Sequence, residues 1–308
     1  MTTPYDYITI DVFTDRPFGG NPLAVVTDAR GLTTEQMQAI AAEFNYSEST
    51  FVLPPDDRAH TARVRIFTRT SEIPFAGHPN VGTAFALALV AEWSARTMAS
   101  PVVFEEAAGL VPVELMRDPA GRVQGATLTA PQSLTMGDKV PVAVVAECVG
   151  LDSSAIITSR HEPMHASVGL PFVIAEVAQD ALARAKPNAG AFAGAAQRYP
   201  TRPGHFSLHL YARTSGARGE PDLRARMFSP LGGTLEDPAT GSANGALGAL
   251  LATLAPEASV VLRLEILQGA EMGRPSMLTV TAEKQGGSVT RVRVGGRCVP
   301  VMEGTLTV

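Results

Sequence analysis

The chain has 308 residues, of which 45% are hydrophobic and 18% are charged, and its formal net charge is −5. This length exceeds what one hydrophobic core usually serves, so it predicts two domains or one large unit with two lobes. The composition is typical of a globular protein, and a mildly acidic chain without a basic run is a poor partner for nucleic acid or an anionic membrane.

The two cysteines, Cys148 and Cys298, occur in no metal-ligand spacing and are typical of reduced structural thiols. The N-terminal residues alternate as a strand does, and they lack the basic and apolar regions of a signal peptide. The longest apolar stretch, residues 84–93, is too short to span a bilayer. We therefore expect a cytoplasmic protein with no membrane partner.

Strands dominate the predicted secondary structure. Runs rich in β-branched and aromatic residues, each bounded by Gly, Pro, Asp or Asn, predict strands. These runs lie at residues 7–13, 22–27, 50–54, 62–68, 111–116, 125–130, 171–177, 206–212, 260–267, 276–283 and 289–296.

Three helices are predicted. Thr33 and Gln36 form a capping box at the start of the first, which runs to residue 44. The second covers about 79–93, and the third begins near Ser242. Because strands do not alternate regularly with helices, the pattern favours an α+β fold over a doubly wound parallel sheet.

The second and third helices have similar surroundings, since each follows an Arg-x-Phe-Thr/Ser strand, a loop and a Gly-x-x-Asn sequence. Gly77 then corresponds to Gly241. Asn80 corresponds to Asn244. This pattern predicts an internal duplication into two similar lobes, each with a sheet around one central helix.

Small residues within the third helix, such as Gly245 and Gly248, would let strands approach that helix closely. Each helix N-terminus also offers unpaired N–H groups and a partial positive charge. Two such ends facing one cleft would form a seat for a small carboxylate.

Four side chains could carry proton transfer. Glu48 lies where the chain turns into a strand, and His78 lies at the start of the second helix. Glu236 and Asp237 precede the third helix. Acids and a histidine at such junctions suit acid–base chemistry. Simpler interpretations are a helix cap for Asp237, a solvated acid for Glu48 and a structural histidine for His78.

The stretch HEPMH, residues 161–165, matches the H-E-x-x-H zinc pattern, which functions only on a helix. Pro163 lies inside it, and a proline in a helix interior costs about 3 kcal/mol. The flanking segments also predict strands. Together with the lack of nucleotide-binding or hydrolase signatures, this leads us to expect neither a metal nor a cofactor.

Five stretches carry a resemblance to a known family: DVFTDRPFGGNPLAVV, NYSESTFVL, RIFTRTSEIPFAGHPNVGTA, RMFSPLGGTLEDPATGSANGAL and ILQGAEMGRPSMLTV. They span nearly the whole chain, which resembles the PhzF-like (phenazine biosynthesis-like) isomerases. The resemblance implies a diaminopimelate-epimerase-like α+β fold of two pseudo-symmetric lobes, each a curled, mostly antiparallel sheet around a central helix. The expected lobes are residues 1–130 with the last strand, about 299–308, and residues 131–298, with the active site in a cleft between them.

The resemblance also implies roles for individual residues. The two positions that carry catalytic cysteines in the epimerases are Ala76 and Thr240 here, so a two-cysteine mechanism is excluded. Glu48 is instead implied as the catalytic base, assisted by His78 and Asp237. The implied substrate-binding residues are Asn21, Ser47, Gly77, Thr240, Gly241 and Ser242.

The function thus implied is cofactor-independent isomerisation, in which a proton moves on a small carboxylated substrate. For this chemistry Glu48 should lie in a low-dielectric cleft that raises its pKa toward neutrality. Two alternatives stay open from the sequence: a lyase or dehydratase that uses the same carboxylates, and a protein that binds a small molecule without turnover. The family resemblance further implies a homodimer.

Overall fold

The computed structural model describes residues 3–308, which form two compact units. The first comprises the described residues up to Thr129 together with Gly295–Val308, and the second is Ala130–Val294. Among the described residues, no helix combines the length and the apolar character needed to cross a membrane.

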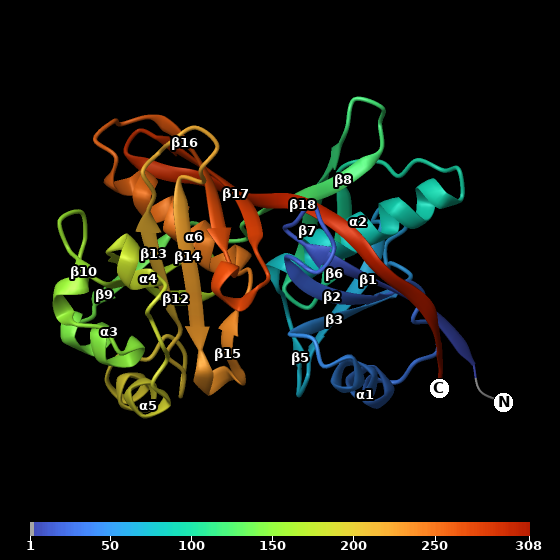
Figure 1. Cartoon of the computed structure of the whole chain (residues 1–308). Coiled ribbons are helices and arrows are strands. Elements are labelled where there is room, and N and C mark those ends of the chain that lie inside the picture. The colour runs from blue at the N-terminus through green and yellow to red at the C-terminus, as the bar shows by residue number, and fades with distance from the viewer. Residues whose placement is uncertain (1–2) are drawn as a thin grey trace. The chain divides into compact units, whose positions relative to one another are not determined.

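Unit 1 is a sheet closed around one helix, α2 (Gly77–Trp93), as Figure 1 shows. The β2–β3 and β4–β6 pairs are parallel, whereas the pairs β1–β2, β1–β18, β3–β4, β6–β7 and β7–β8 are antiparallel. Going round the sheet, the strands are β1 (Pro4–Val12), β2 (Asn21–Val26), β3 (Glu48–Leu53), β4 (Ala62–Thr68), β6 (Val102–Glu106), β7 (Gly109–Arg117), β8 (Val123–Thr129) and β18 (Ser288–Thr307), which pairs back with β1. The short β5 (Glu72–Ile73) lies beside β4.

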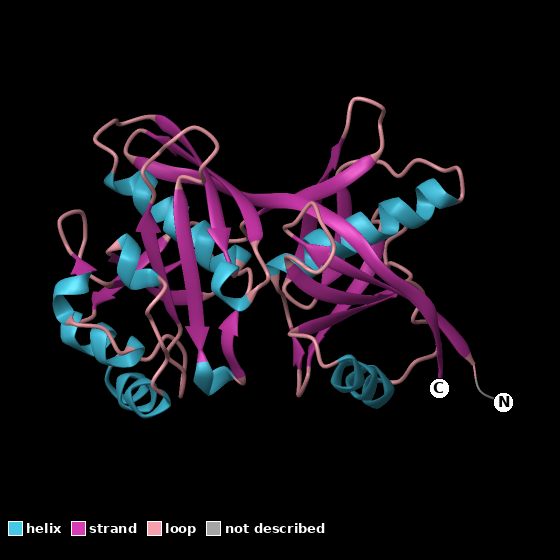
Figure 2. Ribbon diagram, viewed as in Figure 1, coloured by secondary structure: helices cyan, strands magenta, loops and turns pink. Residues whose placement is uncertain are grey.

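Unit 2 repeats this plan around α6 (Gly241–Leu254), and Figure 2 shows the helix among its strands. Its sheet runs through β9 (Thr135–Lys139), β11 (Met164–Ser167), β12 (Pro171–Val177), β13 (Leu208–Arg213), β14 (Leu223–Ser229), β16 (Val260–Gln268) and β17 (Ser276–Gln285). Two short strands, β10 (Ile156–Ile157) and β15 (Thr234–Asp237), pair with β12 and β14. Single 3₁₀ turns occur at Ser153–Ala155, Pro230–Gly232 and Ala270–Met272.

The strand order confirms the predicted duplication. The parallel pair β2–β3 corresponds to β12–β13, and the parallel pair β4–β6 corresponds to β14–β16. Gly77 and Gly241 are the first residues of α2 and α6. In each helix the asparagine three residues on, Asn80 or Asn244, donates from Nδ2 to the N-cap carbonyl oxygen over 3.0 Å. The α+β, diaminopimelate-epimerase-like fold expected from the sequence is therefore confirmed.

Helices also cover the outside of each sheet. In unit 1, α1 (Thr34–Phe44) begins with the predicted capping box and buries Met37 and Ile40 against Phe51 and Phe67. In unit 2, α3 (Val142–Val149), α4 (Gln179–Leu182) and α5 (Ala189–Arg198) pack on the outer side of β12, β13 and β14.

The sequence analysis did not predict α3, α4 or α5. The α3 sequence is rich in valine, whose intrinsic preference is for strands, and tertiary packing overrides that preference. For α5 a signal existed, because Asn188 caps it by accepting from Gly190 N and Ala191 N. The second helix also begins two residues earlier than predicted, at Gly77, because a first-turn proline such as Pro79 is tolerated.

The predicted role of the glycines in α6 is confirmed. A Cβ added at Gly248 would lie 2.5 Å from Val280 Cγ1 on β17, and one at Gly245 would lie 3.1 Å from Val294 Cγ2. A methyl group at Gly248 therefore has no room unless the Val280 side chain or its strand shifts. The sheet can curl tightly around α6 because these positions carry no side chain.

We predict that Gly248→Ala destabilises the protein by about 1–3 kcal/mol, because overpacking outweighs the gain in helix propensity. The matched control is Gly194→Ala in α5, where the nearest atom to an added Cβ is 4.0 Å away. That change should stabilise the protein by about 0.5–1 kcal/mol. Urea denaturation measures both, and stabilisation by Gly248→Ala would contradict the packing argument.

Candidate active site

Unit 1 brings together two of the three predicted catalytic residues. Glu48 is the first residue of β3, Asn21 the first of β2 and His78 the second of α2. The Glu48 Oε2 atom lies 3.6 Å from His78 Nε2. On the other side of the ring, Asn21 Nδ2 lies 3.3 Å from His78 Nδ1. The imidazole therefore bridges a carboxylate and an amide.

Ser47 fixes the orientation of this group, because its hydroxyl donates to Asn21 Oδ1 over 3.2 Å. The amide nitrogen of Asn21 then faces His78 Nδ1, and the ring also bonds the backbone of Pro22, so contacts within unit 1 anchor the imidazole beside Glu48. Asn21 and Ser47, predicted to bind substrate, thus also position the histidine.

His78 is uncharged in this setting. Its side chain is 6% exposed, and burial lowers the pKa of the imidazole to about 3. The contact with Glu48 is therefore between a neutral imidazole and a carboxyl group, at a distance longer than a hydrogen bond. The Glu48 side chain is 19% exposed, so a substrate can reach it.

Unit 2 holds the third predicted catalytic residue, Asp237, at the end of β15. The Thr240 hydroxyl donates to Asp237 Oδ2 over 2.6 Å. Thr240 is the N-cap residue of α6, and Gly241 and the half-buried Ser242 follow it. Asp237 is thereby held beside the N-terminus of α6, as its position in the sequence suggested.

Gln268, which the sequence analysis did not single out, joins these residues. It is fully buried at the end of β16, and its Oε1 accepts from Thr240 N and from Asn244 Nδ2, over 3.2 and 2.7 Å. Its Nε2 donates to Asp237 O and Thr240 Oγ1, over 2.8 and 3.1 Å. One amide thus connects the β15 end to the helix start.

The residue after Gln268 explains how the Gln268 amide comes so close to Asp237 and Thr240. Gly269 has φ +75°, and an added Cβ would lie 2.5 Å from Pro238 O and 2.5 Å from Arg274 O. Only glycine fits this left-handed turn. The sequence signal for this position was the dipeptide Gln268-Gly269 within ILQGAEMGRPSMLTV, one of the five stretches that carry the family resemblance.

The neighbouring acids Glu236 and Asp237 have different partners because successive residues of a strand point to opposite faces. Both oxygens of Glu236 pair with Arg226, whose Nε and Nη2 donate over 2.8 Å each. Arg226 also donates to the carbonyl oxygens of Leu182 and Ala185. Glu236 is therefore structural, and only Asp237 belongs to the candidate site.

The HEPMH segment is not helical, as its proline predicted. His165 lies in strand β11, and His161 lies in the preceding loop. His161 Nε2 is 2.9 Å from the hydroxyl of Tyr211, which donates to Glu176. Residues 3–308 contain no group of three or more His, Cys, Asp or Glu side chains that could hold a metal ion.

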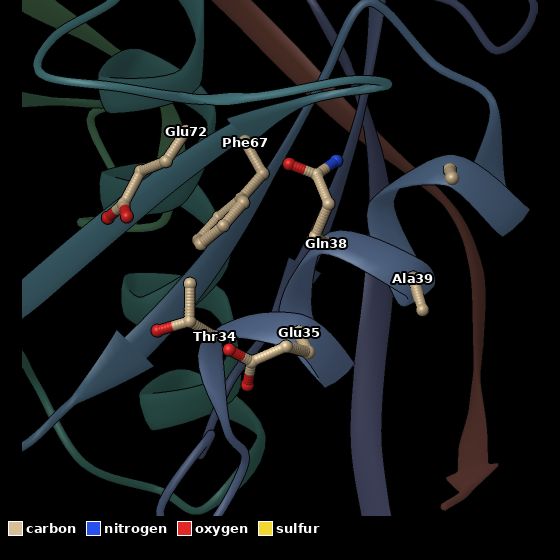
Figure 3. A pocket seen from close by; sticks show the side chains of 7 residues that line it. Thr34, Glu35, Gln38, Ala39, Phe67 and Glu72 are labelled. Carbon is tan, nitrogen blue, oxygen red and sulfur yellow. The ribbon is translucent and has the colours of Figure 1, made fainter.

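A surface pocket in unit 1 is lined by none of these residues. Figure 3 shows it between α1 and the β4–β5 hairpin, with Phe67 at its back and Gln38 at its side. Its lining residues are Thr34, Glu35, Gln38, Ala39, Ala42, Phe67 and Glu72, none of them among the predicted site residues.

Comparison with known proteins decides the family. Residues 10–304 match the model of the phenazine biosynthesis-like protein family. The chain belongs to this family. It is 39% identical over 303 residues to an uncharacterised isomerase of Mesorhizobium japonicum, with 98% of each chain covered.

A second relative, the trans-2,3-dihydro-3-hydroxyanthranilate isomerase of Pseudomonas fluorescens, is 37% identical over 311 residues, which cover 98% of this chain and 99% of the relative. Among solved structures, a PhzF-family phenazine biosynthesis protein of Bacillus anthracis matches with a TM-score of 0.86 and 26% identity, over 99% and 100% of the two chains. The protein is therefore a PhzF-family isomerase, as its sequence motifs suggested.

We predict that Arg226→Met destabilises the protein by about 3–5 kcal/mol, because it leaves the Glu236 carboxylate, 12% exposed, without its partner. Urea denaturation measures the loss. The matched control is Arg184→Met, which breaks an exposed ion pair with Asp180 and should leave stability nearly unchanged. Equal effects of the two substitutions would contradict a structural role for the Arg226–Glu236 pair.

Proposed function

We propose that the protein is a cofactor-independent isomerase that moves a proton on a small carboxylated substrate. Glu48 is the general base, and His78 and Asp237 assist it. The observation that carries this proposal is the pair of Glu48 and His78, a reachable carboxylate beside a buried neutral imidazole. The membership of the family and the isomerase relatives support the same chemistry.

The electrostatics of the pair suit proton transfer by the carboxylate alone. Because burial lowers the pKa of His78 to about 3, the imidazole does not compete for the substrate proton near neutral pH. The neutral ring can instead hold the Glu48 carboxyl group in place for the transfer. Glu48 accepts the proton and returns it at an allylic position.

Asp237 fits an assisting role, because its carboxylate already accepts a hydrogen bond from Thr240 and its backbone is held by Gln268. An anchored carboxylate can orient substrate donors with little loss of side-chain entropy. Relocating a proton next to an activating carboxylate changes no oxidation state, so acid–base groups suffice for the reaction.

For anionic groups of the substrate we propose the helix start of each unit, taken separately: that of α2 in unit 1 and that of α6 in unit 2. Their first residues, Gly77 and Gly241, have no Cβ to obstruct the N–H groups of the first turn, and Ser242 adds a hydroxyl group. Helix N-termini favour anions through these N–H groups and the helix dipole. The substrate of the Pseudomonas fluorescens relative, trans-2,3-dihydro-3-hydroxyanthranilate, carries such a carboxylate and is our test substrate.

A cytoplasmic homodimer completes the proposal. The two cysteines are free and buried, which suits a reducing compartment, and the dimer rests on the family resemblance alone.

We predict a dimeric mass at micromolar concentration. Light scattering measures it, and a monomeric mass would contradict the dimer.

We predict that Glu48→Gln lowers turnover of the test substrate by about 10²–10⁴-fold, because the amide cannot accept a proton. Binding of the substrate should change only a few-fold, since glutamine keeps the size and polarity of glutamate. The measurement is deuterium incorporation into the substrate in deuterated buffer at saturating concentration, read by mass spectrometry.

The matched control is Glu43→Gln, a change at an exposed residue of α1 that should exchange deuterium at the wild-type rate. Wild-type exchange by Glu48→Gln would show that Glu48 is not the base. Loss of water from the substrate, rather than isomerisation, would favour the lyase alternative.

A further inference from the structure

Glu106 is a half-buried residue with buried carboxyl oxygens, and the proposed mechanism does not use it. It is the last residue of β6, at the hairpin that leads to β7. Neither of its carboxyl oxygens is accessible to water, and neither has a hydrogen-bond partner in the described part of the chain. The same hairpin is tied to the segment before α2, because Ala108 N donates to Pro74 O over 3.2 Å.

The polar neighbour of Glu106 is the side-chain amide of Asn80, which is fully buried in the first turn of α2. Asn80 Nδ2 donates to the carbonyl oxygen of Ala76, the N-cap residue. The Oδ1 atom of Asn80 has no donor. The unpaired acceptor oxygens of Glu106 and Asn80 thus lie at the start of α2, which carries Gly77 and His78.

The duplication gives Glu106 a counterpart in unit 2. In the parallel pairs β4–β6 and β14–β16, Ala62 is opposite Phe104 and Leu223 is opposite Ile266. Two residues further along these strands are Glu106 and Gln268. Gln268 contacts Asn244, the counterpart of Asn80, and holds the start of α6 through donors and acceptors of its amide. Glu106 occupies the same place at α2, but its side chain can donate a hydrogen bond only when it is protonated.

Charged groups around Glu106 do not supply a counter-ion. The adjacent Glu105 points to the opposite face of β6, where it accepts from Asp56 N, Asp57 N and His60 Nδ1. The other charged or titratable side chains of the neighbouring elements have their own partners or are exposed: Arg63 pairs with Asp56, Arg65 with Glu72, Glu92 with Arg117 and His78 with Asn21, and Glu114 is exposed.

A carboxylate that is buried without a counter-ion, with only the Asn80 amide beside it, is strongly disfavoured, so the acid keeps its proton. In agreement, burial raises the pKa of Glu106 to about 8, and the interaction with Asn80 opposes this shift only in part. A protonated carboxyl group offers one hydrogen-bond donor and one acceptor oxygen. It therefore matches the amide of Gln268 at the corresponding position in unit 2.

We propose that Glu106 is a neutral acid that hydrogen-bonds the Asn80 amide and thereby positions the start of α2, as Gln268 does for α6. Glu106 is a positioning residue, because it acts through Asn80 and not on the substrate. Its deprotonation places an unpaired charge behind the helix start. That disturbs Gly77 and His78, so the rate falls at alkaline pH; this last step rests on the proposed function.

The first test needs no substrate. The pKa of Glu106 is about 8 in the folded protein, against 4.5 for an ordinary glutamate. The folded state therefore holds a proton that the unfolded chain releases, and this contribution to stability is lost as pH rises from about 4.5 to about 8. Relative to Glu106→Gln, the wild-type folding constant should fall by a factor approaching about tenfold per pH unit across that window, and stay level above it.

Urea denaturation of wild type and Glu106→Gln between pH 5 and 9 measures this ratio. Glu114→Gln, on the adjacent strand β7 and exposed, is the matched control and should follow the wild-type profile. A constant ratio between wild type and Glu106→Gln across the range would overturn the neutral acid.

The second test concerns positioning. Wild-type turnover of trans-2,3-dihydro-3-hydroxyanthranilate should fall above about pH 8, Glu106→Gln should lose this alkaline fall, and Glu106→Leu should be slow at every pH because it cannot bond Asn80. If all three share one pH profile, Glu106 has no positioning role. If the wild type does not turn the substrate over, the proposed substrate fails while the stability test still decides the state of Glu106.

Discussion

Each unit depends on a helix that is buried inside the surrounding sheet, although its start is only partly covered: Gly77 of α2 and Ser242 of α6 are half-buried. Polar side chains near such a helix start must find partners where water does not reach them. In both units an asparagine of the first turn, Asn80 or Asn244, bonds the carbonyl oxygen of the N-cap residue. The neighbouring strand ends in Glu106 or Gln268, which supports that asparagine. These asparagines and the residues behind them set the position of the helix starts that we assign to substrate.

The same strand geometry separates two pairs of adjacent acids. Glu236 faces Arg226 on one side of β15, while Asp237 is held by Thr240 on the other. On β6, Glu105 binds loop N–H groups and His60, while Glu106 lies against α2. In both places one acid stabilises the fold, and the other lies at a helix start. Alternation of side chains along a strand is sufficient to give neighbouring residues these different environments.

The environment of His78 shows how burial selects a chemical role. A histidine near a carboxylate is usually expected to be charged, since the negative charge favours the imidazolium ion. Here desolvation outweighs that attraction, and the ring is neutral. Asn21, oriented by Ser47, takes one ring nitrogen and directs the other toward Glu48. The result is a neutral ring beside the proposed base, which leaves the base to accept the proton.

The sequence by itself determined the two-lobed α+β architecture, because strand periodicity, the capping box of Thr33 and the repeated Gly-x-x-Asn sequence are local signals. It also placed Glu48, His78 and Asp237 at the starts or ends of elements, through motifs of the family. Only the tertiary structure showed that Glu236 pairs with Arg226, that Gln268 holds Asp237 and Thr240, and that Glu106 is buried without a counter-ion. Each of these facts depends on which distant residues meet a side chain, and hydrogen bonding and desolvation between such residues leave no periodic signal in the chain.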